Sequence, residues 1–283
     1  MRLIDCHAHL WHAGHGFGWI TPGSVHDTTF TVSDLERSGD GLELAGSILV
    51  EASRGDRGET LALRELRLTR PDLVAGYVGN LKVYEGIAPS TFAQLLTEAR
   101  PNGMRLGGAG RPEPHETRLL PVLAELGVTL DLNLLTDALG VAAALAQAHP
   151  GLTVVVNHLG NPPNLRTGDL SEWERGLRLA AQEPAVLLKI SGLLTQQSGV
   201  PLGQVVALVE RVLDAVGPER CLVGSDWPIC LPRGSRADSL ELACGGLARL
   251  TSDERAQVLH GTAVRAYRLA GNLMEGTNVI DTC

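Results

Sequence analysis

Short apolar runs recur along the whole chain and alternate with longer stretches of helical periodicity. Several runs are almost entirely apolar, such as Thr153–Asn157 and Val186–Ser191, which is typical of parallel strands that are buried on both faces. Eight such runs each predict a strand. They are Leu3–Cys6, Ser47–Glu51, Val74–Val78, Gly103–Leu106, Val128–Asn133, Thr153–Asn157, Val186–Ser191 and Cys221–Gly224.

Helical patterns fill most of the intervals between these runs. Pro114–Leu126, for example, carries leucines at helical spacing and ends before Gly127, which is a common helix stop. The expected helices are Glu59–Arg70, Pro114–Leu126, Asp137–His149, Leu170–Glu183, Pro201–Val216, Ser239–Leu250 and Ser252–Leu269.

Strands that alternate with helices indicate βαβ units and a parallel sheet. Eight of them in 283 residues favour a closed (β/α)8 TIM barrel over an open sheet. The first connection, from Trp11 to Ala45, is too long for a standard unit and is rich in Gly, His and Thr, so we expect a loop over the barrel mouth. We therefore expect a single domain over residues 1–271, followed by a C-terminal tail over residues 272–283.

Composition and charge narrow the class of protein and of partner. Hydrophobic residues make up 44% of the chain, which excludes a disordered protein, and the net charge of -8 argues against a nucleic-acid partner. Five cysteines without a C-x-x-C motif favour a reducing compartment. The first residues lack a signal-peptide run, and no stretch of 18 apolar residues exists. We expect a cytoplasmic protein with a small-molecule substrate and no membrane partner, and we leave a homo-oligomer open.

The first predicted strand ends in two histidines, within Asp5-Cys6-His7-Ala8-His9-Leu10-Trp11. Strand residues two apart point to the same side, so His7 and His9 face the same way. Barrel enzymes hold their active sites at the carboxyl ends of the strands. Two adjacent imidazoles can bind one divalent metal. Chance placement is the competing interpretation, because five of the nine histidines precede residue 27.

Polar residues also end two later strands of the predicted barrel. His158 follows the sixth run, and Asp226 follows the eighth. Each has a structural alternative, a hydrogen-bonded core histidine for His158 and a turn or helix cap for Asp226. The first and eighth strands are neighbours in a closed barrel, so we expect His7, His9, His158 and Asp226 to converge.

These motifs together resemble the amidohydrolase superfamily, and most closely its amidohydrolase-2 branch of sugar-lactone hydrolases and pyrone-dicarboxylate lactonase. The resemblance implies the barrel fold, hydrolysis of a cyclic ester, and His7, His9, His158 and Asp226 as metal ligands. Its marks are Asp5-Cys6-His7-Ala8-His9-Leu10-Trp11, Asn157-His158-Leu159-Gly160, Leu188-Lys189-Ile190-Ser191-Gly192-Leu193, Gly224-Ser225-Asp226-Trp227-Pro228 and the stretch Gly261–Tyr267.

The chain departs from the family pattern at the residues that hold the second metal ion. Binuclear members carry a bridging Lys or Glu on the fourth strand and a His on the fifth, whereas these strands offer Arg105, Asp131 and Asn133 here. At most one divalent ion, Zn or Mn, is implied, and some lactonases of this pattern work without a metal. Thr262-Ala263 stands where the branch usually has Asn before Ala, a change expected to affect packing.

The implied reaction is attack of water on a lactone carbonyl. Asp226 is expected to accept the water proton, because a carboxylate is ionised at neutral pH. His158, together with His7 and His9, is expected to polarise the carbonyl, either by holding the metal or by direct hydrogen bonds.

Six further residues are candidates for substrate binding. Guanidinium groups suit carboxylates and hydroxyls, with a solvated surface position as the alternative for the two arginines and an equal one for Arg111. A lysine in an apolar strand needs a partner, and a substrate or carboxylate contact is favoured over a structural ion pair. Glu51 and Ser53 end the second strand. Glu51 is expected either to pair with Lys189 or Arg105 or to accept a hydrogen bond from substrate. Each tryptophan either stacks on a sugar or packs in the core. The six are Arg105, Arg111, Lys189, Glu51, Trp11 and Trp227.

Three rival functions remain open at this point. A decarboxylase of the same branch needs a firmly bound metal. A metal-dependent DNase-like barrel also opens with His-x-His, but the net charge of -8 counts against it. A catalytically silent barrel that binds a sugar acid is the third, and the presence of Asp226 and all three histidines counts against it.

Overall fold

The computed structural model describes residues 2–269, and its strands form one parallel sheet in the order β1 to β8. The expected tail over residues 272–283, and the last residues of the expected domain, lie outside the described residues. The strands are β1 (Leu3–Ala8), β2 (Leu44–Val50), β3 (Val74–Asn80), β4 (Gly103–Gly108), β5 (Thr129–Leu134), β6 (Val154–Val156), β7 (Val186–Ile190) and β8 (Cys221–Val223).

The barrel is brought to closure between β1 and the residues that follow β8. The backbone N–H of Asp226 donates to the carbonyl of His7 at 2.8 Å, and that of His9 donates to Trp227 at 2.7 Å. Ala8 and Trp227 form a parallel bridge between these two segments. The expected (β/α)8 barrel is thereby confirmed.

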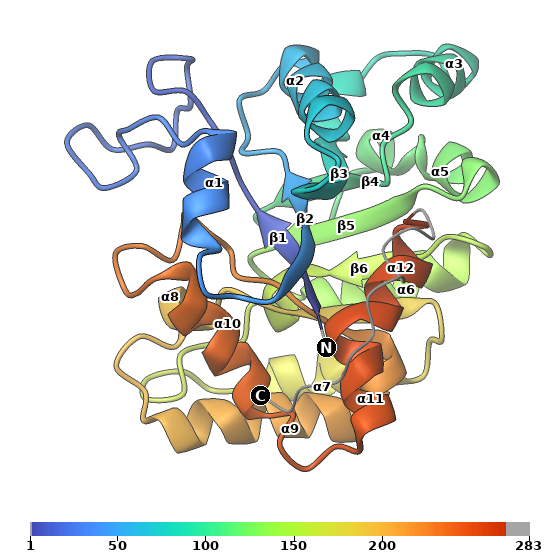
Figure 1. Cartoon of the computed structure of the whole chain (residues 1–283). Coiled ribbons are helices and arrows are strands. Elements are labelled where there is room, and N and C mark those ends of the chain that lie inside the picture. Colours follow the sequence, from blue (N-terminus) through green and yellow to red (C-terminus); the bar gives the residue numbers. More distant parts are fainter. Residues whose placement is uncertain (1, 270–283) are drawn as a thin grey trace.

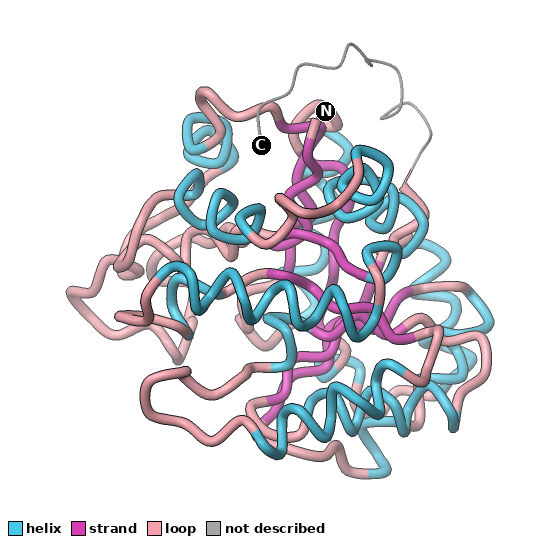
Figure 2. Tube along the Cα trace, turned by 90° about the horizontal axis from the view of Figure 1, so that it is seen from below, coloured by secondary structure: helices cyan, strands magenta, loops and turns pink. Residues whose placement is uncertain are grey.

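Helices surround this central sheet (Figure 2). In the described part of the chain, no helix is long and apolar enough to cross a bilayer. The α-helices are α1 (Val32–Ser38), α2 (Arg57–Thr69), α3 (Pro89–Ala99), α4 (Pro114–Thr117), α5 (Leu120–Leu126), α6 (Ala138–Ala148), α7 (Ser171–Ala181), α8 (Leu193–Gln196), α9 (Leu202–Val216), α10 (Arg236–Gly245), α11 (Ser252–Ala256) and α12 (Thr262–Ala266). Shorter turns are η1 (Lys82–Tyr84), η2 (Asn157–Gly160), η3 (Pro218–Arg220) and η4 (Gln257–Gly261), the last a π-helical turn.

The interior of the barrel is filled by apolar side chains from opposite sides of the sheet. Cys6, Val50, Val155 and Leu222 belong to one buried cluster although they come from β1, β2, β6 and β8. Tyr267, which directly follows α12, belongs to the same cluster and is fully buried. The larger core lies between the strands and the outer helices, which is the usual layering of this fold.

Three expected helices differ clearly from those of the structure, and three α-helices were not predicted. The single helix expected over Pro114–Leu126 is split into α4 and α5, because Pro121 lacks an N–H and its ring crowds the preceding turn. Ser235 caps α10 through a capping box with Asp238, so this helix begins at Arg236 rather than at Ser239. It ends at Gly245, earlier than the expected end at Leu250. The last expected helix is divided by the π-helical turn η4.

The unpredicted helices are α1, α3 and the four-residue α8. Helix α1 lies within the long first connection, the rest of which extends away from the barrel at the upper left of Figure 1. Thr31 forms a capping box with Asp34 at its start, a short-range signal that a Gly- and His-rich context concealed. Helix α3 begins at Pro89 and buries Phe92 and Leu96 one turn apart.

A buried ion pair fixes β1 against the helical layer beside β8. Asp5 and Arg236 lie 2.8 Å apart, and both side chains are essentially inaccessible to solvent. Asp5 also accepts from the N–H and the hydroxyl of Ser225 at 2.8 and 2.7 Å. Arg236 donates further to the hydroxyls of Ser38 and Ser47. The pair therefore connects β1, β2, α1, α10 and the segment that carries Asp226.

We predict that Arg236→Met lowers the free energy of unfolding by about 3–5 kcal/mol, because the carboxylate of Asp5 remains buried without its cation. Urea denaturation at pH 7 measures this loss. The matched control is Arg249→Met, which removes an exposed pair with Asp214 and should change stability little. If the two variants lost the same free energy of unfolding, the pair of Asp5 and Arg236 would not stabilise the fold more than a surface pair does.

Candidate active site

A pocket of about 220 Å³ opens at the carboxyl ends of the strands. Its lining combines polar groups near the strand ends with three apolar side chains, which is typical of a small-molecule site. The lining residues are His9, Trp19, Ala52, Ser53, Arg105, Asn133, His158, Asp226 and Ile229.

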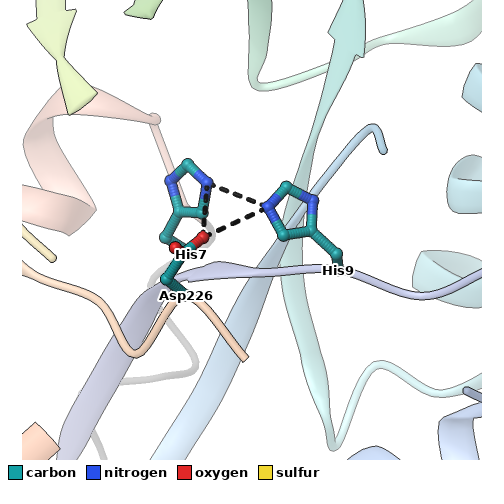
Figure 3. A group of neighbouring side chains, drawn as sticks. All are labelled: His7, His9 and Asp226. Carbon is teal, nitrogen blue, oxygen red and sulfur yellow. Dashed lines mark hydrogen bonds and ion pairs between the residues drawn. The ribbon is translucent and has the colours of Figure 1, made fainter. Parts of the chain in front are cut away.

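Two histidines and one carboxylate, His7, His9 and Asp226, lie side by side (Figure 3), and His9 and Asp226 line this pocket. The Nε2 atoms of His7 and His9 lie 3.1 Å apart. Asp226 Oδ1 lies 3.6 Å from His7 Nε2 and 3.5 Å from His9 Nε2. These distances follow from the fold, because the closure between β1 and the segment after β8 places the three residues side by side.

His158 approaches the same carboxylate from the end of β6. Its Nε2 atom lies 3.9 Å from Asp226 Oδ1, and its Nδ1 atom lies 2.9 Å from the hydroxyl of Ser191. The backbone of His158 and of Asp226 has positive φ values of 54° and 59°, and Ser53 has 65°. Left-handed backbone at non-glycine residues is strained, and here it occurs at three strand ends whose side chains line one pocket.

Burial sets the ionisation of these groups. It lowers the pKa of His158 to about 4 and lowers the pKa of His7 well below its ordinary value, where the nearby Lys189 ammonium acts in the same direction. Both imidazoles are therefore neutral at pH 7. Burial alone would raise the pKa of Asp226, but His158 and His9 outweigh it and the pKa is lowered. The carboxylate is therefore ionised at neutral pH.

The inner nitrogens of the two first-strand histidines have opposite kinds of partner. His9 Nδ1 lies 2.8 Å from the carbonyl oxygen of Val50, an acceptor. His7 Nδ1 lies 3.3 Å from Nζ of Lys189, a donor. Lys189 is itself paired with Asp131 at 2.7 Å, and neither side chain is exposed to solvent.

The donor atoms of this site suit a divalent ion, but one of its supporting contacts does not. Among the described residues, the compact group of metal-type donors is His7, His9 and Asp226, whose ligand atoms lie within 4.8 Å of one another. Imidazole nitrogen and carboxylate oxygen are ligands that zinc takes. Metal-bound histidines usually donate their second N–H to an acceptor, and the ammonium beside His7 cannot accept.

A second charged pair forms one wall of the pocket. Arg105 donates through Nε to Glu51 and through a terminal nitrogen to the hydroxyl of Ser53 at 2.9 Å. Glu51 also accepts from the backbone N–H of Ser53 and from the side chain of Asn80. Of the partners expected for Glu51, the structure has Arg105 and not Lys189. The guanidinium charge is therefore compensated within the protein.

The other residues expected at the site lie away from the pocket surface. Trp11 and Trp227 are buried and both pack against Phe30, at ring-centroid distances of 5.0 and 5.5 Å. Arg111 is exposed and does not line the pocket. Lys189 lies below His7, in the ion pair that the sequence left as the alternative.

Three residues that the structure places at or beside the site, Trp19, Ile229 and Arg236, were not predicted from the sequence. Trp19 belongs to the first connection, and its indole N–H donates to the carbonyl of Ala52 at 2.6 Å, which fixes the ring at the pocket. An aromatic between glycine-rich loop segments was the available signal. Ile229 follows the Trp-Pro step after β8, and no periodicity marks it.

The whole barrel matches a known family. The family model for amidohydrolase matches residues 4–269. The chain is 28% identical to an L-fucono-1,5-lactonase of Burkholderia multivorans, over 94% of this chain and 96% of that protein.

Solved structures of the same fold give a consistent result. An amidohydrolase of Burkholderia multivorans with bound zinc superposes with a TM-score of 0.83 at 28% identity, covering 95% of this chain and 100% of that one. A Pseudomonas putida protein described as a 2-pyrone-4,6-dicarboxylic acid hydrolase superposes with a TM-score of 0.74. Its identity is 22%, with 94% and 97% of the two chains covered, so it supports the fold alone.

We predict that His158 makes the folded protein sensitive to acid. The unfolded chain protonates this histidine below pH 6.5, whereas the folded protein takes the proton only near pH 4, so stability is lost as the pH falls between these values. His158→Asn should reduce the loss of unfolding free energy between pH 6.5 and 4.5 by about 2–3 kcal/mol. Urea denaturation at the two pH values measures it.

The control for this comparison is His12→Asn, in the exposed first connection. A pH dependence that stays the same in His158→Asn would show that His158 takes up its proton equally in the folded and unfolded chains.

Proposed function

The chain belongs to the amidohydrolase family, and on that premise we propose that this enzyme is a lactonase. Its proposed substrate is an uncharged sugar lactone, the cyclic ester of a sugar acid. The observation that carries the proposal is the ionised Asp226 carboxylate at the pocket, beside the neutral imidazoles of His7 and His158. The lactonase relative from Burkholderia multivorans supports the reaction class.

The charges of the pocket favour a neutral ring over a dicarboxylate. Arg105 is the cation of the lining, and Glu51 neutralises it. Asp226 adds a negative charge to the same pocket, so a substrate with two carboxylates would meet net repulsion. Ser53 and Asn133 provide hydroxyl and amide groups for sugar hydroxyls.

Asp226 acts as the general base in the proposed reaction. Its Oδ1 atom lies 3.6, 3.5 and 3.9 Å from Nε2 of His7, His9 and His158, longer than a typical hydrogen bond, so this oxygen can still accept a proton from water. The water oxygen bonds to the lactone carbonyl carbon as its proton passes to Asp226. The ring C–O bond then breaks, and the same proton passes to the departing ring oxygen. The product is the open hydroxy acid.

His158 is assigned to polarise the carbonyl. If the hydroxyl of Ser191 donates to Nδ1, then Nε2 carries the ring proton and points toward Asp226 and the pocket. A donor at this position stabilises the negative charge that develops on the carbonyl oxygen. The zinc of the Burkholderia relative makes His7, His9 and Asp226 candidate ligands of an ion, but no step above requires one.

Trp19 is assigned to bind the apolar face of the sugar ring. Its side chain is 40% exposed although it lines the pocket, and the bond from its N–H to Ala52 holds the ring in place. An exposed aromatic beside polar groups is the usual arrangement for contact with a sugar.

We predict that Asp226→Asn keeps the fold and lowers kcat by about 10²–10⁴-fold, because the amide cannot accept the proton from water. Proton release from a panel of sugar 1,4- and 1,5-lactones is the measurement, with circular dichroism as the check on folding. Turnover close to that of the unsubstituted enzyme would remove Asp226 from the role of base.

The panel is run with and without a chelator, and with pyrone dicarboxylate as a matched charged substrate. We expect hydrolysis of neutral sugar lactones that survives chelation. Carbon dioxide release from an aromatic or unsaturated acid, lost on chelation, would instead favour the decarboxylase alternative.

We predict that Trp19→Ala raises KM by about 5–30-fold with a smaller change in kcat, which corresponds to 1–2 kcal/mol of binding. Trp19→Phe is the matched control, since it keeps an aromatic ring and should recover most of the loss. If both variants retain the original KM, the indole does not contact substrate.

A further inference from the structure

Lys189 is one of only two lysines in the chain, and it is buried in the barrel interior below the candidate site. Its Nζ atom lies 2.7 Å from Asp131 Oδ2 and 3.3 Å from His7 Nδ1. The other oxygen of Asp131 accepts the hydroxyl of Tyr267 at 2.7 Å. Lys189 therefore does not line the pocket, and its contact with His7 connects it to the site.

The direction of each hydrogen bond in this group follows from which atoms can accept. Paired with the carboxylate of Asp131, Lys189 is an ammonium, which has three donors and no acceptor. It can only donate to His7 Nδ1. A neutral imidazole carries one ring proton, so the proton of His7 then lies on Nε2.

The other histidine has the complementary arrangement. The carbonyl of Val50 can only accept, so His9 donates to it from Nδ1. The 3.1 Å contact between the two Nε2 atoms requires one proton between them. His7 supplies this proton and His9 accepts it, so every contact in the chain from Lys189 to Val50 has one donor and one acceptor.

This arrangement conflicts with metal binding at the same atoms. An ion coordinated by His7 Nε2 needs the lone pair of that nitrogen, which is used by the proton. The proton has no place on Nδ1, because the ammonium of Lys189 occupies that side.

We propose that Lys189 is a positioning residue that holds His7 as an Nε2–H donor, and that it thereby disfavours a divalent ion between His7, His9 and Asp226. The side chains of His7, His9 and Asp226 could either bind a metal ion or form hydrogen bonds, and Lys189 favours the hydrogen bonds. This inference concerns the site of the proposed lactonase, but its test uses no substrate. The inference and the proposed function can therefore be contradicted independently of each other.

The first measurement uses the unaltered protein labelled with ¹⁵N at histidine, treated with chelator. Two-bond ¹H–¹⁵N correlation spectra distinguish the two neutral tautomers, and His7→Asn and His9→Asn assign the signals. We expect His7 to carry its proton on Nε2 and His9 on Nδ1. A proton on Nδ1 of His7 would overturn the proposal without the need for any variant of Lys189.

The second measurement is zinc affinity, by competition with a chromophoric chelator. Lys189→Gln replaces the ammonium with an amide that can donate to Asp131 and accept from His7 Nδ1. We expect zinc to bind at least about tenfold more tightly in this variant, the size of effect usual for partners of metal ligands. In its spectrum, the proton of His7 should move to Nδ1.

Two further variants complete the design. Lys82→Gln is the matched control, because Lys82 is the other lysine and forms a surface pair with Glu116. It should leave zinc affinity and the histidine spectrum unchanged. Lys189→Met, combined with Asp131→Asn to avoid an unpaired buried carboxylate, replaces Lys189→Gln if that variant does not fold. Zinc affinity that is the same in the folded Lys189 variants and the unaltered protein would overturn the proposal.

Discussion

Two backbone hydrogen bonds between β1 and the segment after β8 have a double effect in this molecule. They bring the two ends of the sheet together, and they place Asp226 directly beside His7 and His9. The first and last parts of the barrel are more than 200 residues apart in sequence, yet the site requires both. Closure of the barrel and assembly of the candidate active site are therefore one structural event.

Buried charges support this junction on both sides. Asp5 and Arg236 tie β1 to the helical layer and hold Ser225, the neighbour of Asp226. Lys189 and Asp131 lie inside the barrel, below His7. A buried ion pair contributes little net stability compared with apolar packing, and its retention is better explained by the geometry it fixes. Here each pair fixes one of the segments that meet at the pocket.

The chemistry of the site depends on neutral and charged groups being kept distinct. Burial keeps His7 and His158 neutral at pH 7, whereas the pKa of Asp226 is lowered and its carboxylate is ionised. Arg105 is neutralised by Glu51 within the pocket wall. One carboxylate is thus left to accept a proton, in a pocket whose other polar groups suit a neutral, hydroxylated ring. Enzymes commonly separate acid and base roles through such differences in environment.

The sequence by itself determined the barrel and the residues that end its strands. Buried parallel strands are continuous apolar runs, so their number and order could be read directly, and His7, His9, His158 and Asp226 stood out as polar groups at their carboxyl ends. Helices α1, α3 and α8 escaped prediction. The signals of α1 and α3 are a local cap and two apolar residues rather than a long periodic stripe, and α8 has only four residues.

Only the tertiary structure decided which charged group meets which. The sequence left Lys189 with a substrate contact or an ion pair, and it left Glu51 with two basic partners. The barrel pairs Lys189 with Asp131 and Glu51 with Arg105, and each pair joins strands that are not neighbours in the sheet. Trp19 could not be placed at the pocket from sequence, because a loop has no period that fixes its direction. Pairing between distant strands and loop conformation depend on three-dimensional packing, which a linear pattern does not encode.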